Sequence, residues 1–154
     1  MADGTLSEDI LNQAIYLEIH TRDFYREIAA KIENKKGNSQ MLKLANQEDF
    51  HRDILEARFK KLFEREFVQD PEYPKDPKIA SVKSAVFDQS SAKEVISIGI
   101  TGENNAIQLY RKQIDTVTDA EDISLLKKLV KFEEQHKKTL QKIYARLEKK
   151  FSWI

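Results

Sequence analysis

Four long stretches of the chain repeat apolar residues every three or four positions, which is the spacing of helices with one buried face. Patterns typical of capping boxes open the first and third stretches, at Thr5-x-x-Glu8 and Ser91-x-x-Glu94. We expect the first helix to stop near Gly37. The predicted helices run over about Ser7–Asn34, Ser39–Phe67, Ser91–Val117 and, from Thr118 or Asp119, to Lys150. The pattern therefore predicts an all-α protein.

The connections between these helices differ in length. Short turns join the first helix to the second and the third to the fourth, so each pair should form an antiparallel hairpin. All three prolines follow the second helix, at Pro71, Pro74 and Pro77, where no helix could continue. The connection from about Val68 to Ser90 is long enough to cross a four-helix bundle, as happens in one class of such bundles. A short helical piece is weakly indicated within Ile79–Phe87.

The second and fourth apolar stripes each contain a Glu-x-x-His pair. These pairs are Glu48 with His51 and Glu133 with His136. The number of residues from Glu48 to Glu133 along the chain is the same as that from His51 to His136. We call this separation the repeat offset. Residues three apart lie on one face of a helix, so all four polar side chains point in the same direction as the apolar ones. Such an arrangement is costly in a core unless the polar groups have partners.

The repeat offset also relates the first helix to the third. It aligns Glu18 with Glu103 and Tyr25 with Tyr110 in the sequence, and both glutamates lie within apolar stripes. The chain is therefore two similar helical hairpins, each with one lone Glu and one Glu-x-x-His pair.

Buried carboxylates need compensation, because an unpaired one costs several kcal/mol and four close together repel each other. They could be protonated, pair with Lys or Arg, or bind cations. No Lys or Arg shares the stripe near the lone glutamates, although Arg52 and Lys137 lie at the edges of the other two stripes. Two divalent cations would balance four carboxylates, and two neutral imidazoles would complete the ligand set. We therefore predict a two-metal site formed by Glu18, Glu48, His51, Glu103, Glu133 and His136.

Composition excludes several other kinds of chemistry. The 154 residues suffice for one domain, which we expect to span 1–154. The 26 basic and 26 acidic residues cancel, so bulk charge gives no reason to expect a nucleic-acid or membrane partner. No signal peptide or long uncharged apolar run is evident, so we expect a cytoplasmic protein. The absence of cysteine removes disulfides, thiolate chemistry and Cys-ligated metal sites.

With its lone glutamates on two helices and Glu-x-x-His on the other two, the sequence resembles the ferritin-like superfamily. The segments AIYLEIHTRDFYREIA and GITGENNAIQLYRKQI, in which Tyr lies two helical turns after Glu, are most similar to rubrerythrin-type domains. The resemblance covers about Leu6 to Lys150 and implies a ferritin-like four-helix bundle. It also implies that Glu48 and Glu133 bridge two metals, that the lone glutamates are terminal ligands, and that each histidine binds one metal.

The sequence departs from this family in three places. Rubrerythrins usually carry a further carboxylate one turn after the Glu of the third helix, where this chain has Ala106, so its site is more symmetric and closer to that of bacterioferritin. Full rubrerythrins also have a rubredoxin-like domain with four cysteines, and this sequence contains none. Bacterioferritins bind haem through a Met beside the second-helix ligands. Asp49 and Phe50 stand there instead, so we expect no haem.

Two functions remain open after this comparison. Carboxylate and imidazole ligands suit iron or manganese, with zinc as a substitute, and the resemblance implies two iron ions per chain. One interpretation is an oxidoreductase, working as a homodimer, that reduces hydrogen peroxide or oxygen with electrons from a separate donor protein. The other is a ferroxidase or an iron storage or delivery protein. Tyr25 and Tyr110 either support the ligands as hydrogen-bonding partners or relays, or are ordinary core tyrosines, and we expect His20 at the surface.

Overall fold

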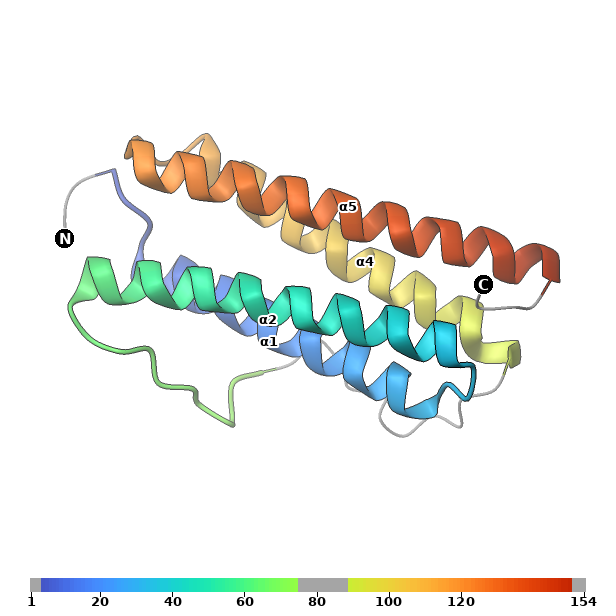
Figure 1. The fold of residues 1–154 in the computed structure, drawn as a ribbon. Helices are drawn as coiled ribbons and strands as arrows, with labels where there is room; N and C mark the ends of the chain where they lie inside the picture. Colours follow the sequence, from blue (N-terminus) through green and yellow to red (C-terminus); the bar gives the residue numbers. More distant parts are fainter. Residues whose placement is uncertain (1–3, 75–88, 151–154) are drawn as a thin grey trace.

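The computed structural model describes residues 4–74 and 89–150, which form a bundle of long helices (Figure 1). The helices α1 and α2 form one antiparallel hairpin, and α4 and α5 form the other. The predicted all-α fold is confirmed, with its two hairpins and a long connection between them. The piece predicted within Ile79–Phe87 lies outside the described residues. The helix bounds are α1 Glu8–Lys31, α2 Lys35–Phe63, α4 Gln89–Ile114 and α5 Ala120–Lys150.

Several predicted helix ends were wrong by a few residues. Ser7, rather than Thr5, caps α1, because its hydroxyl oxygen accepts a hydrogen bond from the backbone N–H of Ile10 at 3.2 Å. Gly37 does not end a helix but lies in the first turn of α2, where its N–H donates to the side-chain oxygen of Asn34 at 2.9 Å. Asn34 thus starts α2 earlier than predicted. At its other end α2 stops at Phe63 because Glu64 adopts a left-handed conformation, with φ of 56°.

The first described residues are attached to the turn between α4 and α5. The carbonyl of Gly4 accepts hydrogen bonds from the N–H groups of Thr118 and Asp119, at 2.9 and 3.1 Å. Gly4 has φ of +83°, and a Cβ there would lie 2.0 Å from the Thr118 hydroxyl, so only glycine fits. Leu6 then donates its N–H to Asp122 Oδ2 at 2.8 Å. This segment therefore links the two hairpins.

The core consists of two apolar layers with a polar layer between them. Along α1, residues from Leu11 to Ile19 belong to one layer and residues from Phe24 to Ile32 to the other. The remaining helices divide in the same way, and in α2, α4 and α5 the Glu or Glu-x-x-His pair falls between the two apolar groups. In α1, Glu18 is followed by Ile19, the last buried residue of the first layer. The glutamates and histidines singled out by the sequence thus lie near the middle of each helix rather than at its ends.

The chain after α2 folds back along α1 and covers part of it. Tyr73 stacks on Tyr16 with ring centroids 3.7 Å apart, and the N–H of Asp70 donates to the Tyr16 hydroxyl at 2.5 Å. His20, predicted at the surface, is buried at 8% exposure because Tyr16 and Tyr73 lie against it. Within the described residues no helix is both long and apolar enough to cross a membrane.

Candidate metal centre

The middle layer brings together all six residues that the sequence singled out. Each helix contributes at the same level of the bundle, because the Glu or Glu-x-x-His pair interrupts its apolar stripe there. None of the six is more than 4% exposed. They are Glu18 from α1, Glu48 and His51 from α2, Glu103 from α4, and Glu133 and His136 from α5. We refer to them as the six-residue centre.

His51 faces three carboxylates through one ring nitrogen. Its Nδ1 lies 3.0 Å from Glu133 Oε1 and 3.7 Å from both Glu18 Oε2 and Glu48 Oε2. A nitrogen and several oxygens converging at such distances leave little room for anything but a small cation between them. This half of the centre therefore combines residues from three helices.

His136 repeats this arrangement with the corresponding residues. Its Nδ1 contacts Glu48 Oε1 and lies 3.2 Å from Glu133 Oε2 and 3.6 Å from Glu103 Oε1. Glu48 and Glu133 therefore face both histidines, whereas Glu18 faces only His51 and Glu103 only His136. The two imidazole rings are roughly parallel, with centroids 5.3 Å apart. The repeat in the sequence is thus also a repeat in space, with two carboxylates shared between its halves.

Some of these atoms have no hydrogen-bond partner. Glu48 Oε1, Glu133 Oε2 and His136 Nδ1 are buried and lie against one another, but they make no hydrogen bond to a described residue. A buried polar group without a partner costs about 1–3 kcal/mol, and more if it is charged. Ligand atoms of Glu48, His51, Glu133 and His136 also lie within 4.8 Å of one another. Oxygen and nitrogen atoms that are buried, unpaired and convergent fit divalent metal ions.

Two tyrosines hold the carboxylates that are not shared. The Tyr110 hydroxyl donates to Glu18 Oε1 at 2.5 Å, and the Tyr25 hydroxyl donates to Glu103 Oε1. Each tyrosine thus reaches from one hairpin to the glutamate of the other. Burial and the nearby carboxylates raise the pKa of both phenols well above their ordinary value, so both remain donors at neutral pH. They fix the orientation of the lone glutamates.

Without metal, protons must stabilise the carboxylates. Burial, together with the charges of Glu18 and Glu103, raises the pKa of Glu48 to about 8. Burial and the charges of Glu18 and Glu48 raise the pKa of Glu133 to about 7. The pKa of Glu103 is raised well above its ordinary value by burial and by Glu133. Glu18 is the exception: burial opposes its ionisation, but hydrogen bonds to Glu48 and His51 lower its pKa to about 2.

The histidines attract protons for the same reason. Burial works against a charged imidazole, but hydrogen bonds to Glu133 and Glu18 outweigh it and raise the pKa of His51 to about 12. The pKa of His136 rises in the same way beside Glu103 and Glu133. In the metal-free protein, protons therefore provide the positive charge that the carboxylates require. A bound metal would displace them, because ligands bind metals in their deprotonated forms.

The two histidines differ on their outer sides. His136 Nε2 pairs with the side-chain oxygen of the exposed Gln47 at 2.8 Å, a hydrogen bond that leaves Nδ1 free for a metal. Phe132, which the repeat offset aligns with Gln47, instead stacks on His51 with centroids 5.1 Å apart. Sequence reasoning missed both residues, although the repeat aligns them directly and shows that they differ.

No Lys or Arg in the described part of the chain pairs with the six-residue centre. Arg52, which the sequence placed at the edge of the stripe, points outward and pairs with Asp49 and Asp53 at 3.3 and 3.0 Å. None of the ion pairs formed by Lys or Arg in the described residues involves one of the six residues. His20 is not part of the centre, since its ring contacts Tyr16 and Tyr73.

Comparison with known proteins agrees with this description. A solved structure of a hypothetical protein from Pyrococcus furiosus is 28% identical, with a TM-score of 0.81 over 96% of this chain and 93% of that one. A protein from Thermotoga maritima, described as a candidate ferritin-like diiron-carboxylate protein, is 26% identical, with a TM-score of 0.71 over 89% of this chain and 93% of that one. No curated protein matches the chain.

The fold and the centre together define the class of ferritin-like proteins with a carboxylate and histidine site for two metals. Within this class the family is also clear. The family model for rubrerythrin matches residues 9–144, and the chain belongs to the rubrerythrin family.

Proposed function

We propose that this protein is a non-haem di-iron oxidoreductase that reduces hydrogen peroxide, or oxygen, with electrons from a separate donor protein. The observation that carries this proposal is the six-residue centre, in which two imidazoles share Glu48 and Glu133 and no described Lys or Arg pairs with the carboxylates. Reduction of one hydrogen peroxide to two water molecules takes up two electrons and two protons. The chain has no cysteine to supply electrons itself, so a donor is required.

The residues of the centre divide into three roles in this proposal. Glu48 and Glu133, which face both histidines, would serve both metals, while Glu18 and Glu103 would each hold one. The histidines would bind through Nδ1, the nitrogen that faces the carboxylates. Iron bound by this set would alternate between its ferrous and ferric states and so supply the two electrons. The apolar layers above and below keep bulk water from the ligands, since residues such as Ile15 and Leu140 are fully buried.

One observation favours iron handling as a second candidate function. Ala106 is buried one turn after Glu103, where a further carboxylate is usual in rubrerythrins. The corresponding residue of the first half, Thr21, is buried too, and its hydroxyl donates to the carbonyl of Leu17 at 2.8 Å. Neither half therefore adds a seventh ligand at this position. A symmetric site of six ligands would also suit a ferroxidase or an iron storage or delivery protein.

Stopped-flow spectroscopy separates these candidates. Protein loaded anaerobically with Fe(II) is mixed with hydrogen peroxide or with oxygen at equal concentration, and oxidation is followed by absorbance. We expect faster oxidation by peroxide, and repeated turnover only when a donor is added. Ala106→Glu should increase the preference for peroxide, whereas Ala106→Gln, of similar size, should not. Faster oxidation by oxygen, with iron taken up as a soluble mineral beyond two ions per chain, would favour iron storage. No reaction with either oxidant would refute both candidates.

A further inference from the structure

A cavity of about 560 Å³ opens between α2 and α5 beside the six-residue centre. His136 lies in its wall, and its Nε2 pairs with the exposed Gln47, which also lines the cavity. The cavity is therefore a place where the surface comes within one side chain of an expected metal ligand. We call it the α2–α5 pocket; α2 supplies most of its lining, including Lys35, Lys36, Lys43 and Gln47, and α5 supplies the rest, including His136.

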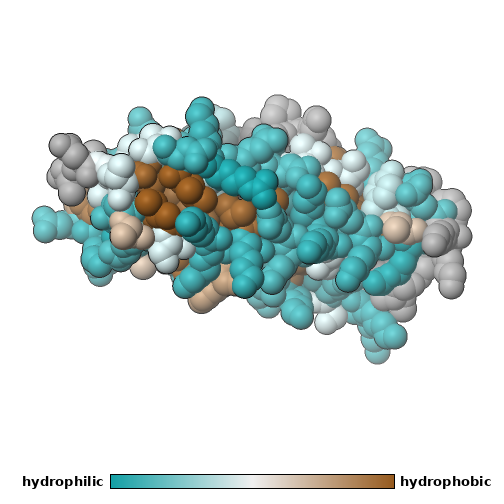
Figure 2. Space-filling model, turned by 90° about the horizontal axis from the view of Figure 1, so that it is seen from above, coloured by the Kyte–Doolittle hydropathy of each residue, from teal (hydrophilic) through white to brown (hydrophobic). Residues whose placement is uncertain are grey.

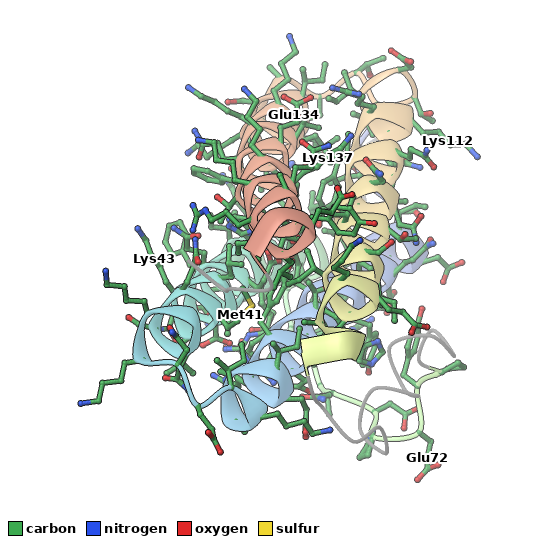
Figure 3. All side chains as sticks on the ribbon, turned by 90° about the vertical axis from the view of Figure 1, so that its right-hand side faces the viewer. Met41, Lys43, Glu72, Lys112, Glu134 and Lys137 are labelled. Atoms are coloured by element: carbon green, nitrogen blue, oxygen red, sulfur yellow. The ribbon has the colours of Figure 1, made fainter. Side chains whose placement is uncertain are left out.

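The α2–α5 pocket has a positive charge that its own lining does not cancel. The lining contains Lys35, Lys36 and Lys43, all exposed, and no carboxylate. None of the three lysines forms an ion pair with another described residue. The first turn of α2 has no acidic residue, so the positive end of the helix dipole adds to their charge. Figure 3 looks onto this end of the bundle and shows Lys43 on the outer side of α2, with Met41 pointing inward.

The other half of the molecule lacks this pocket chemistry. The repeat replaces Gln47 by Phe132, which covers the ring of His51. It also replaces Lys35 and Lys36 by Ala120 and Glu121. On the face that Figure 2 shows, an apolar area lies toward the end where α5 begins, amid a mostly hydrophilic surface. Corresponding positions in the two halves of the chain thus differ in charge, although the expected metal ligands of the two halves match.

We propose that the α2–α5 pocket is the docking site of an acidic, one-electron redox protein that acts as the electron donor. This inference rests on the proposed function. A lysine-lined entrance repels Fe(II) and is indifferent to uncharged peroxide, but it attracts the carboxylates of a partner protein. Two docking events, each delivering one electron, provide the two electrons that one hydrogen peroxide consumes with two protons from water. Gln47 and His136 would then lie between the partner and the metals.

Binding to a purified acidic carrier tests this proposal without relying on turnover. The probe is a plant-type [2Fe–2S] ferredoxin, and its affinity is measured by calorimetry for both metal-free and zinc-loaded protein at about 20 mM salt. We expect the triple variant K35E/K36E/K43E to bind at least about tenfold more weakly than the natural protein. Raising the salt to about 0.3 M should remove most of the binding, since exposed charges are then screened.

A matched variant controls for overall charge. K127E/K128E/K131E changes the net charge equally on the exposed side of α5, and Lys128 is the repeat partner of Lys43. We expect this variant to bind ferredoxin within about threefold of the natural protein, and both variants to keep their helical circular dichroism. Failure of the natural protein to bind, or equal weakening by both variants, would overturn the proposal. Displacement of ferredoxin by inorganic phosphate at constant ionic strength would also overturn it, because the pocket would then be a small-anion site.

A second measurement distinguishes failure of docking from failure of the proposed function. Peroxide turnover is driven either by reduced ferredoxin or by a small reduced dye that needs no docking surface. We expect K35E/K36E/K43E to lose about tenfold or more of the ferredoxin-driven rate while keeping the dye-driven rate. Loss of both rates would contradict docking, and binding without any turnover in the natural protein would contradict the peroxide reaction instead.

Discussion

Two clusters of charged residues among the described parts of the chain have buried members, and they are neutralised in different ways. In the first, which we call the Arg58 cluster, Arg58 pairs with Asp122 at 2.5 Å, Asp119 at 3.0 Å and Glu121 at 2.8 Å. Asp122 also accepts the N–H of Leu6 at 2.8 Å. The second is the six-residue centre, which has four carboxylates and, among the described residues, no Lys or Arg partner.

The difference shows how a stabilising cluster can be told from a binding site. The Arg58 cluster contains its own cation and is complete as folded. It joins α2, α5 and the first described residues of the chain, which are far apart in sequence. The six-residue centre keeps three buried atoms that make no hydrogen bond, and the pKa values of Glu48 and Glu133 are raised, so its positive charge must come from protons or metals. Buried acids without a basic partner therefore indicate where this protein binds metal.

The largest effect should follow from removing the shared carboxylates. We expect E48Q/E133Q to reduce tight Fe(II) binding from two ions per chain to none, because both halves lose a bridging ligand. The metal-free variant should stay folded, since amides need no counter-ion. The matched control D49N/E134Q changes the neighbouring residues, which pair outward with Arg22 and Arg111. Anaerobic titration should still give two ions for this control, and tight binding by E48Q/E133Q would refute the site.

Breaking the Arg58 cluster should affect stability rather than metal content. Arg58→Met leaves Asp122 buried without its cation, and we expect a loss of about 3–5 kcal/mol in the free energy of unfolding. Urea denaturation of the metal-free protein measures it. Lys61→Met removes an exposed pair with Glu121 and should cost less than about 1 kcal/mol. If Arg58→Met abolished metal binding in a protein that remained folded, the two clusters would not be independent.

Metal removal should make stability depend on pH in a particular direction. The pKa values of Glu48, Glu133 and His51 are raised on folding, to about 8, 7 and 12, so the native metal-free protein holds extra protons. Its stability should be greatest at mildly acidic pH and should fall as pH rises through these values. The pKa of Glu18, lowered to about 2, matters only as pH falls below about 4.5.

Bound metal should reverse this trend, because it replaces those protons. We expect the increase in Tm produced by Mn(II) to grow from about pH 5.5 to about pH 8. Thermal unfolding followed by circular dichroism at both pH values, with and without Mn(II), gives the comparison. A metal-free protein that becomes more stable over this range would contradict the assignment of the protons to the six-residue centre.

The smallest effect concerns the two tyrosines. Tyr25→Phe or Tyr110→Phe removes one hydrogen bond to a lone glutamate, and we expect metal affinity to fall about tenfold. Tyr16→Phe removes a hydroxyl that accepts a backbone N–H outside the centre, so affinity should not change. Competition with a chelator provides the measurement. Equal affinities for all three variants would show that the tyrosines serve only packing.

Much of the fold followed from local patterns in the sequence. Apolar periodicity located the helices, because a helix in water must bury one face. The helix ends were predicted less accurately. Several neighbouring residues could cap a helix, and Ser7 and Asn34 do so because their side chains reach the backbone N–H groups of the first turn. His20 was misplaced for a different reason. Tyr73 covers it, and Tyr73 lies beyond the whole of α2 in the sequence.

The sequence by itself determined which six residues meet in the six-residue centre, since an internal repeat of constant offset and helical spacing place each on a buried face. Only the tertiary structure decided how they share partners: which carboxylates face both histidines, and which tyrosine crosses to which glutamate. It also decided that Arg58 would neutralise Asp122 rather than the centre. Helical periodicity specifies the direction in which each side chain points around the axis of its helix. Contacts between helices depend instead on how whole helix faces pack together.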